Sequence, residues 1–353
     1  MIESVEVSKF KGLREVKLRN LSRINVLVGD NGSGKTCLLE AIFLAAGLGP
    51  ELYLRTRAWR GSGEKLPLGL DRDQYEALWK ELFYGLDQNE LVTLGFTDSN
   101  QGERRLNVSY DVAQSTLMPL DLNVRTSYES GDIHPISFKW KIGTGEEVVI
   151  AVPNPSGGPL QLQQIKHAYP MVFFAPTTIF SSEENAKRFS FLSRRRRHEP
   201  IVEMMRSMFP MVEDLSVEIV AGFPGIYASI KGLEEKVSIG SLSAGLTKYM
   251  TILLGIAAMP KGVVLVDEIE NGFFYKKYGD VWKGITSLAH QHEVQLFLST
   301  HSIECVQAAF PIVSEHSSWF SLLRTERRGS ECIVKQFSGK DFFAALEQRT
   351  EFR

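Results

Sequence analysis

A glycine-rich segment that ends in lysine and threonine is the strongest chemical signal in this 353-residue chain. Residues 29–36 read GDNGSGKT and match the pattern G-x-x-x-x-G-K-[ST]. In this pattern, backbone N–H groups converge on phosphate oxygens and a following helix adds positive potential. Lys35 would neutralise the β- and γ-phosphates of a nucleotide, and the Thr36 hydroxyl would bind Mg²⁺. The predicted nucleotide-binding residues are Gly29, Asp30, Asn31, Gly32, Ser33, Gly34, Lys35 and Thr36.

Two adjacent acids follow a short apolar run in VVLVDEIENG, at 263–272. A carboxylate at the carboxyl end of a buried strand, beside a phosphate loop, can bind Mg²⁺ directly or through water. We therefore expect Asp267 to bind the metal together with Thr36. The next residue, Glu268, is expected to orient and deprotonate the attacking water. An Asp-Glu pair is a weak signal by itself, but here it supplies the acids that the glycine-rich loop requires.

Two further segments contain groups that suit a phosphate. SLSAG at 241–245 opens a predicted helix, where Ser243 and the backbone of Gly245 would bind a phosphate at the helix N-terminus. LFLSTHS at 296–302 ends a predicted strand, and His301 would sense the γ-phosphate and hold the water-activating group. Taken alone, the SLSAG segment could equally be an ordinary helix cap, and a single histidine at a strand end is more often structural. Their order, with the loop first and the acids between them, favours a nucleotide-hydrolysing site.

The apolar patterns around these motifs predict how the chain brings them together. The runs at 24–28 and 263–266 are typical of buried strands, and apolar residues recur at helical spacing from 38 to 46. About 230 residues separate the loop from the acid pair, so the two strands must belong to one sheet if they serve one nucleotide. Further strands are predicted at 171–175 and 294–298, and helices at 182–209, 243–258 and 275–291.

The middle of the chain has a different pattern. Apolar and polar residues alternate from 91 to 152, which is typical of an antiparallel sheet, and 71–84 has the spacing of an amphipathic helix. Residues 51–70 are expected to be irregular. We therefore predict an α/β fold with a mixed central sheet built by 1–50 and 165–353, and an inserted helical and antiparallel β region at 51–164. No heptad pattern is sustained, which excludes a long coiled coil.

Composition and charge exclude several classes of protein. The chain has 40 Lys and Arg against 42 Asp and Glu, a net charge of −2, so any nucleic-acid contact must use a local patch. The three cysteines, far apart in the sequence, argue against a disulfide framework or a zinc cluster. Without a signal-like apolar core or an apolar run of about 18 residues, we expect a soluble cytoplasmic protein.

Taken together, these motifs resemble the ABC-type ATPases of the SMC/RecF/OLD (overcoming lysogenization defect) branch. The similar segments lie within 1–50 and about 165–345, roughly two thirds of the chain. The DEIENG form is especially similar to OLD-type and related phage-defence ATPases, whereas transporter subunits more usually carry proline after the Asp-Glu pair. The segments are FKGL (10–13), VGDNGSGKT (28–36), SLSAGLTKYM (241–250), VLVDEIENGFFY (264–275) and FLSTHSIE (297–304).

The resemblance implies a P-loop NTPase of the ABC-ATPase head type that binds ATP and Mg²⁺ as a two-fold dimer. Ser243 and Gly245 of one subunit would contact the γ-phosphate of ATP held by the other. Asn271 and Gly272 would form the D-loop that communicates across the dimer, and His301 would be the switch histidine. The lysines where such proteins approach the nucleotide from the N-terminal strand are Lys9 and Lys11, although surface lysines in a turn are the favoured interpretation.

The chain also departs from the family pattern. Its signature reads Leu-Ser-Ala-Gly, without glycine at the third position. The glutamine that usually ligates Mg²⁺ has no clear counterpart, and its candidates are Gln161, Gln163 and Gln164. About fifty residues follow His301, too few for the nuclease domain that OLD enzymes carry. The resemblance therefore covers the ATPase half alone.

Four consecutive arginines, Arg194, Arg195, Arg196 and Arg197, form the clearest local basic patch. They would bind the phosphates of DNA or RNA with a strong salt dependence, or dock an acidic partner. A solvated helix end is the plainer interpretation. A second basic and aromatic cluster, which includes Trp59 and Arg60, is expected to pack on the surface.

Three functions remain open on the sequence alone. The first is an ATPase that senses or scaffolds for a separate effector, such as a nuclease, in phage defence. The second is a RecF-like ATPase of DNA repair or DNA loading. The third, a transporter subunit, is disfavoured by the large insertion and by Ile269 after the acid pair. A non-enzymatic scaffold is disfavoured because Lys35, Asp267 and Glu268 are all present.

Overall fold

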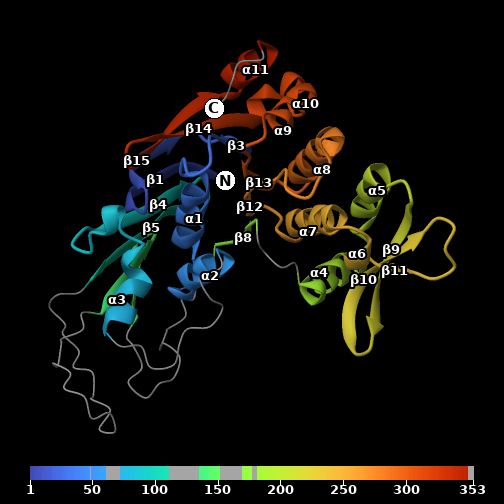
Figure 1. Cartoon of the computed structure of the whole chain (residues 1–353), viewed down its shortest axis with the longest axis horizontal. Helices are drawn as coiled ribbons and strands as arrows, with labels where there is room; N and C mark the ends of the chain where they lie inside the picture. Colours follow the sequence, from blue (N-terminus) through green and yellow to red (C-terminus); the bar gives the residue numbers. More distant parts are fainter. Residues whose placement is uncertain (48, 61–71, 111–134, 152–168, 177–180, 349–353) are drawn as a thin grey trace, which may run out of the picture.

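The computed structural model describes residues 1–47, 49–60, 72–110, 135–151, 169–176 and 181–348. Its centre is a six-stranded sheet with the strand order β15-β14-β3-β13-β12-β8 (Figure 1). Five strands are parallel, and β15 runs antiparallel to β14. The strands are β3 (Ile24–Val28), β8 (Met171–Phe174), β12 (Val263–Val266), β13 (Gln295–Ser299), β14 (Phe320–Arg328) and β15 (Glu331–Ser338).

The order of the central strands decides where the predicted motifs meet. Strands β3, β12 and β13 are buried along their whole length, as expected for parallel strands covered on both faces. Because β13 pairs with both β3 and β12, the three carboxyl ends lie at one edge of the sheet. The glycine-rich loop, the acid pair and the Thr-His-Ser segment follow these three ends. The prediction that the loop and the acid pair belong to one sheet is confirmed.

A second, antiparallel sheet has the order β2-β1-β4-β5-β6-β7. The antiparallel strands predicted between 91 and 152 are present, and β4 hydrogen-bonds to β1. The region assigned to the insertion thus extends a sheet that begins in the N-terminal hairpin. The strands are β1 (Ile2–Phe10), β2 (Leu13–Arg19), β4 (Val92–Asp98), β5 (Gly102–Tyr110), β6 (Ile136–Ile142) and β7 (Gly145–Ala151).

Helix α1 (Lys35–Ala46) joins the two sheets, because it contacts β1, β4 and β5 on one side and β8 and β13 on the other. Helix α2 (Glu51–Trp59) follows it, so the expectation of an irregular segment is wrong for its first nine residues. The helix forms because it buries Leu52 and Tyr53, and the Tyr53 ring stacks on Trp79 of α3 (Arg72–Lys80) with ring centroids 5.6 Å apart. The helix predicted at 71–84 is confirmed as α3.

A helical lobe covers the face of the central sheet opposite α1 (Figure 1). Its central helix α7 (Ala244–Ala258) is buried over most of its length and packs on α4, α5 and α8. At 15 residues α7 is far too short for a long coiled coil, and within the described residues no helix is long and apolar enough to cross a membrane. The other elements of the lobe are α4 (Ser182–Ser193), α5 (Glu199–Met208), α6 (Ile239–Leu242), α8 (Tyr278–Gln291), β9 (Val212–Val220), β10 (Phe223–Ile230) and β11 (Val237–Ser238).

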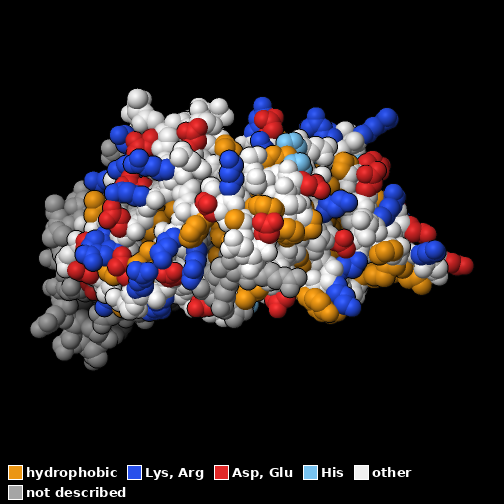
Figure 2. All heavy atoms as spheres, turned by 90° about the horizontal axis from the view of Figure 1, so that it is seen from above, with side chains coloured by type: hydrophobic (Ala, Val, Ile, Leu, Met, Phe, Trp, Pro, Cys, Tyr) orange, Lys and Arg blue, Asp and Glu red, His pale blue; other side chains and the backbone are white. Residues whose placement is uncertain are grey.

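The last elements pack at the β14–β15 end of the sheet (Figure 1): α9 (Ile303–Gln307), α10 (Phe310–Glu315) and α11 (Gly339–Glu347). Basic and acidic side chains are interspersed over the face in Figure 2, as the near-zero net charge predicts. Exposed apolar side chains gather at the β9–β10 turn, where Ile219 is 73% and Phe223 78% exposed.

Candidate functional site

The glycine-rich loop is held tightly between β3 and β14. Gly29 has φ +141°, and a Cβ atom there would lie 2.2 Å from the carbonyl oxygen of Thr325. The Ser33 and Thr325 hydroxyls lie 2.5 Å apart, and the Thr325 hydroxyl donates to the Val28 carbonyl. Gly29 is therefore needed both for its backbone conformation and for its close approach to β14.

Replacing Gly29 with alanine is expected to lower the free energy of unfolding by about 2–4 kcal/mol, because backbone strain and overpacking each cost roughly 1–3 kcal/mol. The matched control is Gly222→Ala, since Gly222 also has positive φ (+84°) but a Cβ atom there would meet no described residue within 4 Å. It should lose only about 1–2 kcal/mol. Urea denaturation measures both variants, and equal losses would contradict the role of close packing.

Lys35, the first residue of α1, folds back over the loop. Its Nζ atom donates to the carbonyl oxygens of Gly29 at 2.6 Å and Asp30 at 2.9 Å. Burial lowers the pKa of Lys35, while the nearby carboxylates of Asp267, Glu270 and Glu268 oppose that shift. The ammonium group is thus fixed where the loop would hold phosphates, close enough to neutralise their charge.

Asp267 links the loop to the two neighbouring strands. The Thr36 hydroxyl donates to Asp267 Oδ2 at 2.7 Å, and the Ser299 hydroxyl at the end of β13 donates to Oδ1. Asp267 is only 1% exposed. A carboxylate and a hydroxyl at this separation are the oxygen ligands that Mg²⁺ prefers when phosphates and water complete its shell. These residues therefore fit the metal that the sequence predicts.

Glu268 has an unusual backbone conformation that its neighbours hold in place. Its φ is +49°, in the left-handed region, which is costly for a non-glycine residue. Its backbone N–H donates to the Ser299 hydroxyl at 2.8 Å, and its carbonyl accepts from Lys248 Nζ of α7 at 2.7 Å. The Asn271 side chain donates to Glu268 Oε2. Both the backbone and the carboxylate of Glu268 are thus held in a defined orientation at the end of β12.

A cavity of about 680 Å³ lies in front of this edge of the sheet, a volume that suits a nucleotide. It brings together the phosphate loop and both acids of the Asp-Glu pair. Trp59 and Arg60, which were expected to pack on the surface, also line it, because the α1–α2 geometry brings them here. The lining residues are Gly12, Asn31, Gly32, Gly34, Lys35, Thr36, Cys37, Trp59, Arg60, Pro176, Asp267, Glu268, Arg327, Ser330 and Cys332.

His301 follows β13 and pairs with Glu270, a residue that the sequence motifs did not single out. Both the backbone N–H of His301 and its Nδ1 atom lie 2.8 Å from Glu270 Oε1. The His301 side chain is 41% exposed, whereas that of Glu270 is 5% exposed. His301 is not among the residues that line the cavity within the described chain, and its Nδ1 atom lies beside the buried Glu270 carboxylate.

Ser243 and Gly245 lie apart from the residues that line the cavity within the described chain. The Ser243 hydroxyl caps α7 by accepting from the Leu246 N–H at 3.0 Å. A Cβ atom at Gly245 would lie 2.3 Å from the Gly272 carbonyl oxygen, so α7 begins directly against the turn after the acid pair. Within one chain, the structure does not bring this helix start to the phosphate loop.

The structure also describes the predicted lysines and arginines, but not the predicted glutamines. Lys9 pairs with Glu90 at 2.6 Å and Lys11 with Glu40 at 2.5 Å, so both lysines are engaged in ion pairs. The four arginines at 194–197 are exposed in the turn between α4 and α5. Within that turn the Arg195 guanidinium lies 3.7 Å from the centre of the Phe191 ring. The glutamine candidates at 161, 163 and 164 lie outside the described residues.

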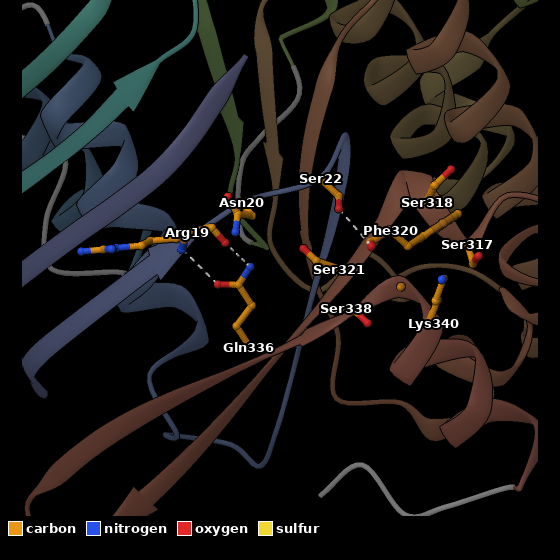
Figure 3. Close-up of a pocket in the computed structure, with 11 residues that line it drawn as sticks. Arg19, Asn20, Ser22, Ser317, Ser318, Phe320, Ser321, Gln336, Ser338 and Lys340 are labelled. Carbon is orange, nitrogen blue, oxygen red and sulfur yellow. Dashed lines mark hydrogen bonds between the residues drawn. The ribbon is translucent and has the colours of Figure 1, made fainter.

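A second pocket of about 520 Å³ lies beside β15 and α11 (Figure 3). Its polar groups serve the fold: Gln336 bonds the backbone N–H and carbonyl of Arg19, and the Ser22 hydroxyl donates to the Phe320 carbonyl. The Ser338–Asp341 capping box already occupies the N-terminus of α11. The acid pair and Lys35 line the cavity of about 680 Å³, which we therefore take as the candidate site.

Comparisons with known proteins agree with this geometry, although no family model matches the chain. An ATP/GTP phosphatase of Helicobacter pylori is 21% identical over 339 residues, which cover 89% of each chain. A DNA replication and repair protein RecF of Idiomarina loihiensis is 54% identical over 43 residues, 12% of each chain. Among solved structures, an Smc head bound to the C-winged helix domain of ScpA matches 96% of this chain and 99% of its own, with 17% identity and a TM-score of 0.53. The chain thus has the fold of an SMC head domain over nearly its whole length.

Proposed function

On the premise of this SMC-head fold, we propose that the chain is an ABC-type head ATPase that binds ATP and Mg²⁺ in the 680 Å³ cavity and hydrolyses ATP. The convergence of Lys35, Asp267 and Glu268 at one edge of the sheet carries the proposal, because each meets a separate need of phosphoryl transfer. The likeness to an ATP/GTP phosphatase over 89% of the chain supports it.

In this mechanism the loop N–H groups and Lys35 bind the β- and γ-phosphates. Thr36 and Asp267 would hold Mg²⁺, which would neutralise charge on the phosphates. Glu268 orients a water for in-line attack on the γ-phosphorus and accepts its proton, while the bond from that phosphorus to the β–γ bridging oxygen breaks and ADP leaves with this oxygen. The left-handed backbone of Glu268, fixed by Ser299 and Lys248, sets the carboxylate direction before the nucleotide arrives.

We further infer a two-fold, head-to-tail dimer. Ser243 and Gly245 lie outside the cavity of their own chain, but the N-terminus of α7 suits a phosphate offered by a second copy. A two-fold arrangement then closes two nucleotides between the subunits, and hydrolysis removes the shared γ-phosphate contact and loosens the dimer.

For the biological role, we propose a sensor or scaffold for a separate effector, such as a nuclease or toxin, in phage defence in the cytoplasm. The DEIENG sequence supports it by its similarity to OLD-type ATPases. The Smc head structure, bound to ScpA, supports the idea that such a fold docks a separate protein. An alternative is a RecF-like role on DNA, which the similarity to RecF and the exposed arginines at 194–197 favour. ATP-dependent DNA binding by the isolated protein would decide for the alternative.

The dimer is tested by light scattering with and without ATP. Glu268→Gln should trap a dimer of twice the monomer mass with ATP, and Glu268→Gln combined with Ser243→Asp should stay monomeric. Aspartate keeps the cap of α7 but repels the γ-phosphate. The matched control is Ser181→Asp, at the N-cap of α4, which should leave the trapped dimer intact. A Glu268→Gln protein that binds ATP but remains monomeric would rule out the dimer.

A further inference from the structure

Glu270 is a buried acid whose arrangement the proposed function does not yet explain. Its side chain is 5% exposed, and one carboxylate oxygen, Oε1, receives both contacts from His301: the backbone N–H at 2.8 Å and the ring Nδ1 at 2.8 Å. The other oxygen, Oε2, is buried and has no hydrogen-bond partner among the described residues. Within that part of the chain, the carboxylate thus accepts one hydrogen bond, from the His301 backbone, and its other close polar contact is the ring of the same residue.

Fold stability does not account for this arrangement. A buried carboxylate oxygen without a partner is unfavourable, because water solvates it in the unfolded chain. The Lys248 ammonium belongs to the same buried cluster of charges, but it donates its hydrogen bond to the Glu268 carbonyl at 2.7 Å. A neutral side chain at position 270 would avoid the desolvation, so a role in the site is the better explanation of the acid.

The local fold fixes Glu270 relative to His301. The Ile269 N–H donates to the Ser299 carbonyl at 3.0 Å, and the Glu268 N–H donates to the Ser299 hydroxyl. These bonds join the turn after β12 to the end of β13, so the two segments keep one register. The backbone around Glu270 is therefore held directly against the backbone around His301 by hydrogen bonds.

We propose that Glu270 is a positioning residue that fixes the His301 ring and presents its Nε2 atom to the γ-phosphate region. In an imidazole ring Nδ1 and Nε2 lie on opposite sides of the ring carbon between them, so anchoring Nδ1 on Glu270 turns Nε2 away from the protein core. A carboxylate oxygen 2.8 Å from Nδ1 favours a proton on that nitrogen in the neutral ring, which leaves Nε2 as the acceptor. This inference rests on the proposed ATPase function.

The kinetic test compares Glu270→Leu with Glu270→Gln. Leucine removes the acceptor and should lower kcat by about 10- to 100-fold, the usual range for a residue that orients a functional group. KM should change much less, because the phosphate loop is untouched. Glutamine keeps an acceptor oxygen and should retain most of the activity. In the His301→Gln background, Glu270→Leu should have little further effect, because the ring it positions is gone.

The matched control is Glu315→Leu, since Glu315 pairs with His316 at 3.9 Å on the surface, where it is 75% exposed. It should leave kcat unchanged. Full additivity of Glu270→Leu and His301→Gln would overturn the positioning role, as would loss of activity in Glu270→Gln equal to that in Glu270→Leu. Thermal melts check that each variant folds.

A spectroscopic test does not depend on ATP turnover. In protein labelled with ¹⁵N-histidine, the His301 signals, assigned by their loss in His301→Gln, should show a proton on Nδ1. Glu270→Leu should shift that proton to Nε2, and Glu315→Leu should not. An identical pattern in wild type and Glu270→Leu would overturn the inference. If the wild type hydrolyses no nucleotide but the pattern shifts, the proposed function fails while the Glu270–His301 pairing stands.

Discussion

Replacing Glu268 with glutamine is expected to lower kcat for ATP hydrolysis by about 10²–10⁴-fold, the contribution typical of a general base. The amide cannot accept the proton of the attacking water. The turn should persist, because the Ser299 and Lys248 bonds reach the backbone of residue 268, which the substitution leaves in place. ATP affinity should therefore change by no more than about 3-fold. Phosphate release and binding of a fluorescent ATP analogue measure the two quantities.

The control for this variant is Glu293→Gln. Glu293 has a left-handed backbone as well, with φ +56°, but its side chain is 63% exposed at the α8–β13 turn. It reports the effect of a Glu-to-Gln change at a strained position away from the chemistry, and kcat should be that of the wild type. Full activity in Glu268→Gln would show that a different group accepts the proton.

Replacing Lys35 with methionine is expected to weaken ATP binding by about 10- to 100-fold or more, since hydrogen bonds to a charged group contribute roughly 1.5–3 kcal/mol each. In the absence of nucleotide, by contrast, the same substitution should not lower the free energy of unfolding and can raise it. Burial lowers the pKa of Lys35, so the charged form at neutral pH is held at a cost to folding that methionine does not have. We therefore expect the unfolding midpoint without ATP to stay or rise.

Denaturation with and without ATP separates the two effects of Lys35→Met. Wild type should be stabilised by ATP and Mg²⁺, because they bind only the folded state, and the variant should not. Lys187→Met, at a lysine that is 73% exposed on α4, is the control and should keep the ATP-induced stabilisation. A Lys35→Met protein that ATP stabilises as strongly as wild type would exclude a phosphate role for this lysine.

The sequence predicted the elements whose signals are local. Strands β3, β12 and β13 are short apolar runs, and the glycine-rich loop between β3 and α1 has a pattern with few alternatives. That the loop and the acid pair meet at one sheet was also predicted, because a single nucleotide needs both of them. The segments that contain Ser243 and His301 were also singled out from the sequence, but their distances from the cavity depend on packing that no local pattern contains.

What the sequence did not predict depends on contacts between distant residues. Helix α2 forms because Tyr53 stacks on Trp79, and it carries Trp59 and Arg60 into the cavity. Strand β4 joins β1 across more than eighty residues, so a region with its own period-two pattern becomes part of the N-terminal sheet. No role was predicted for Glu270, because its contact with His301 joins residues 31 positions apart and leaves no local sequence pattern.

The place of β3 in the central sheet has a consequence for synthesis of the chain. β3 is made first among the central strands, yet both its neighbours, β13 and β14, come about 270 residues later or more. At about 5–20 residues per second, the ribosome needs roughly 10–60 s to supply them. Until then the strand that ends in the glycine-rich loop has two open edges. A nascent chain thus has a long period in which it is prone to aggregate, and the proposed ATP binding can stabilise only a chain that already includes β13 and β14.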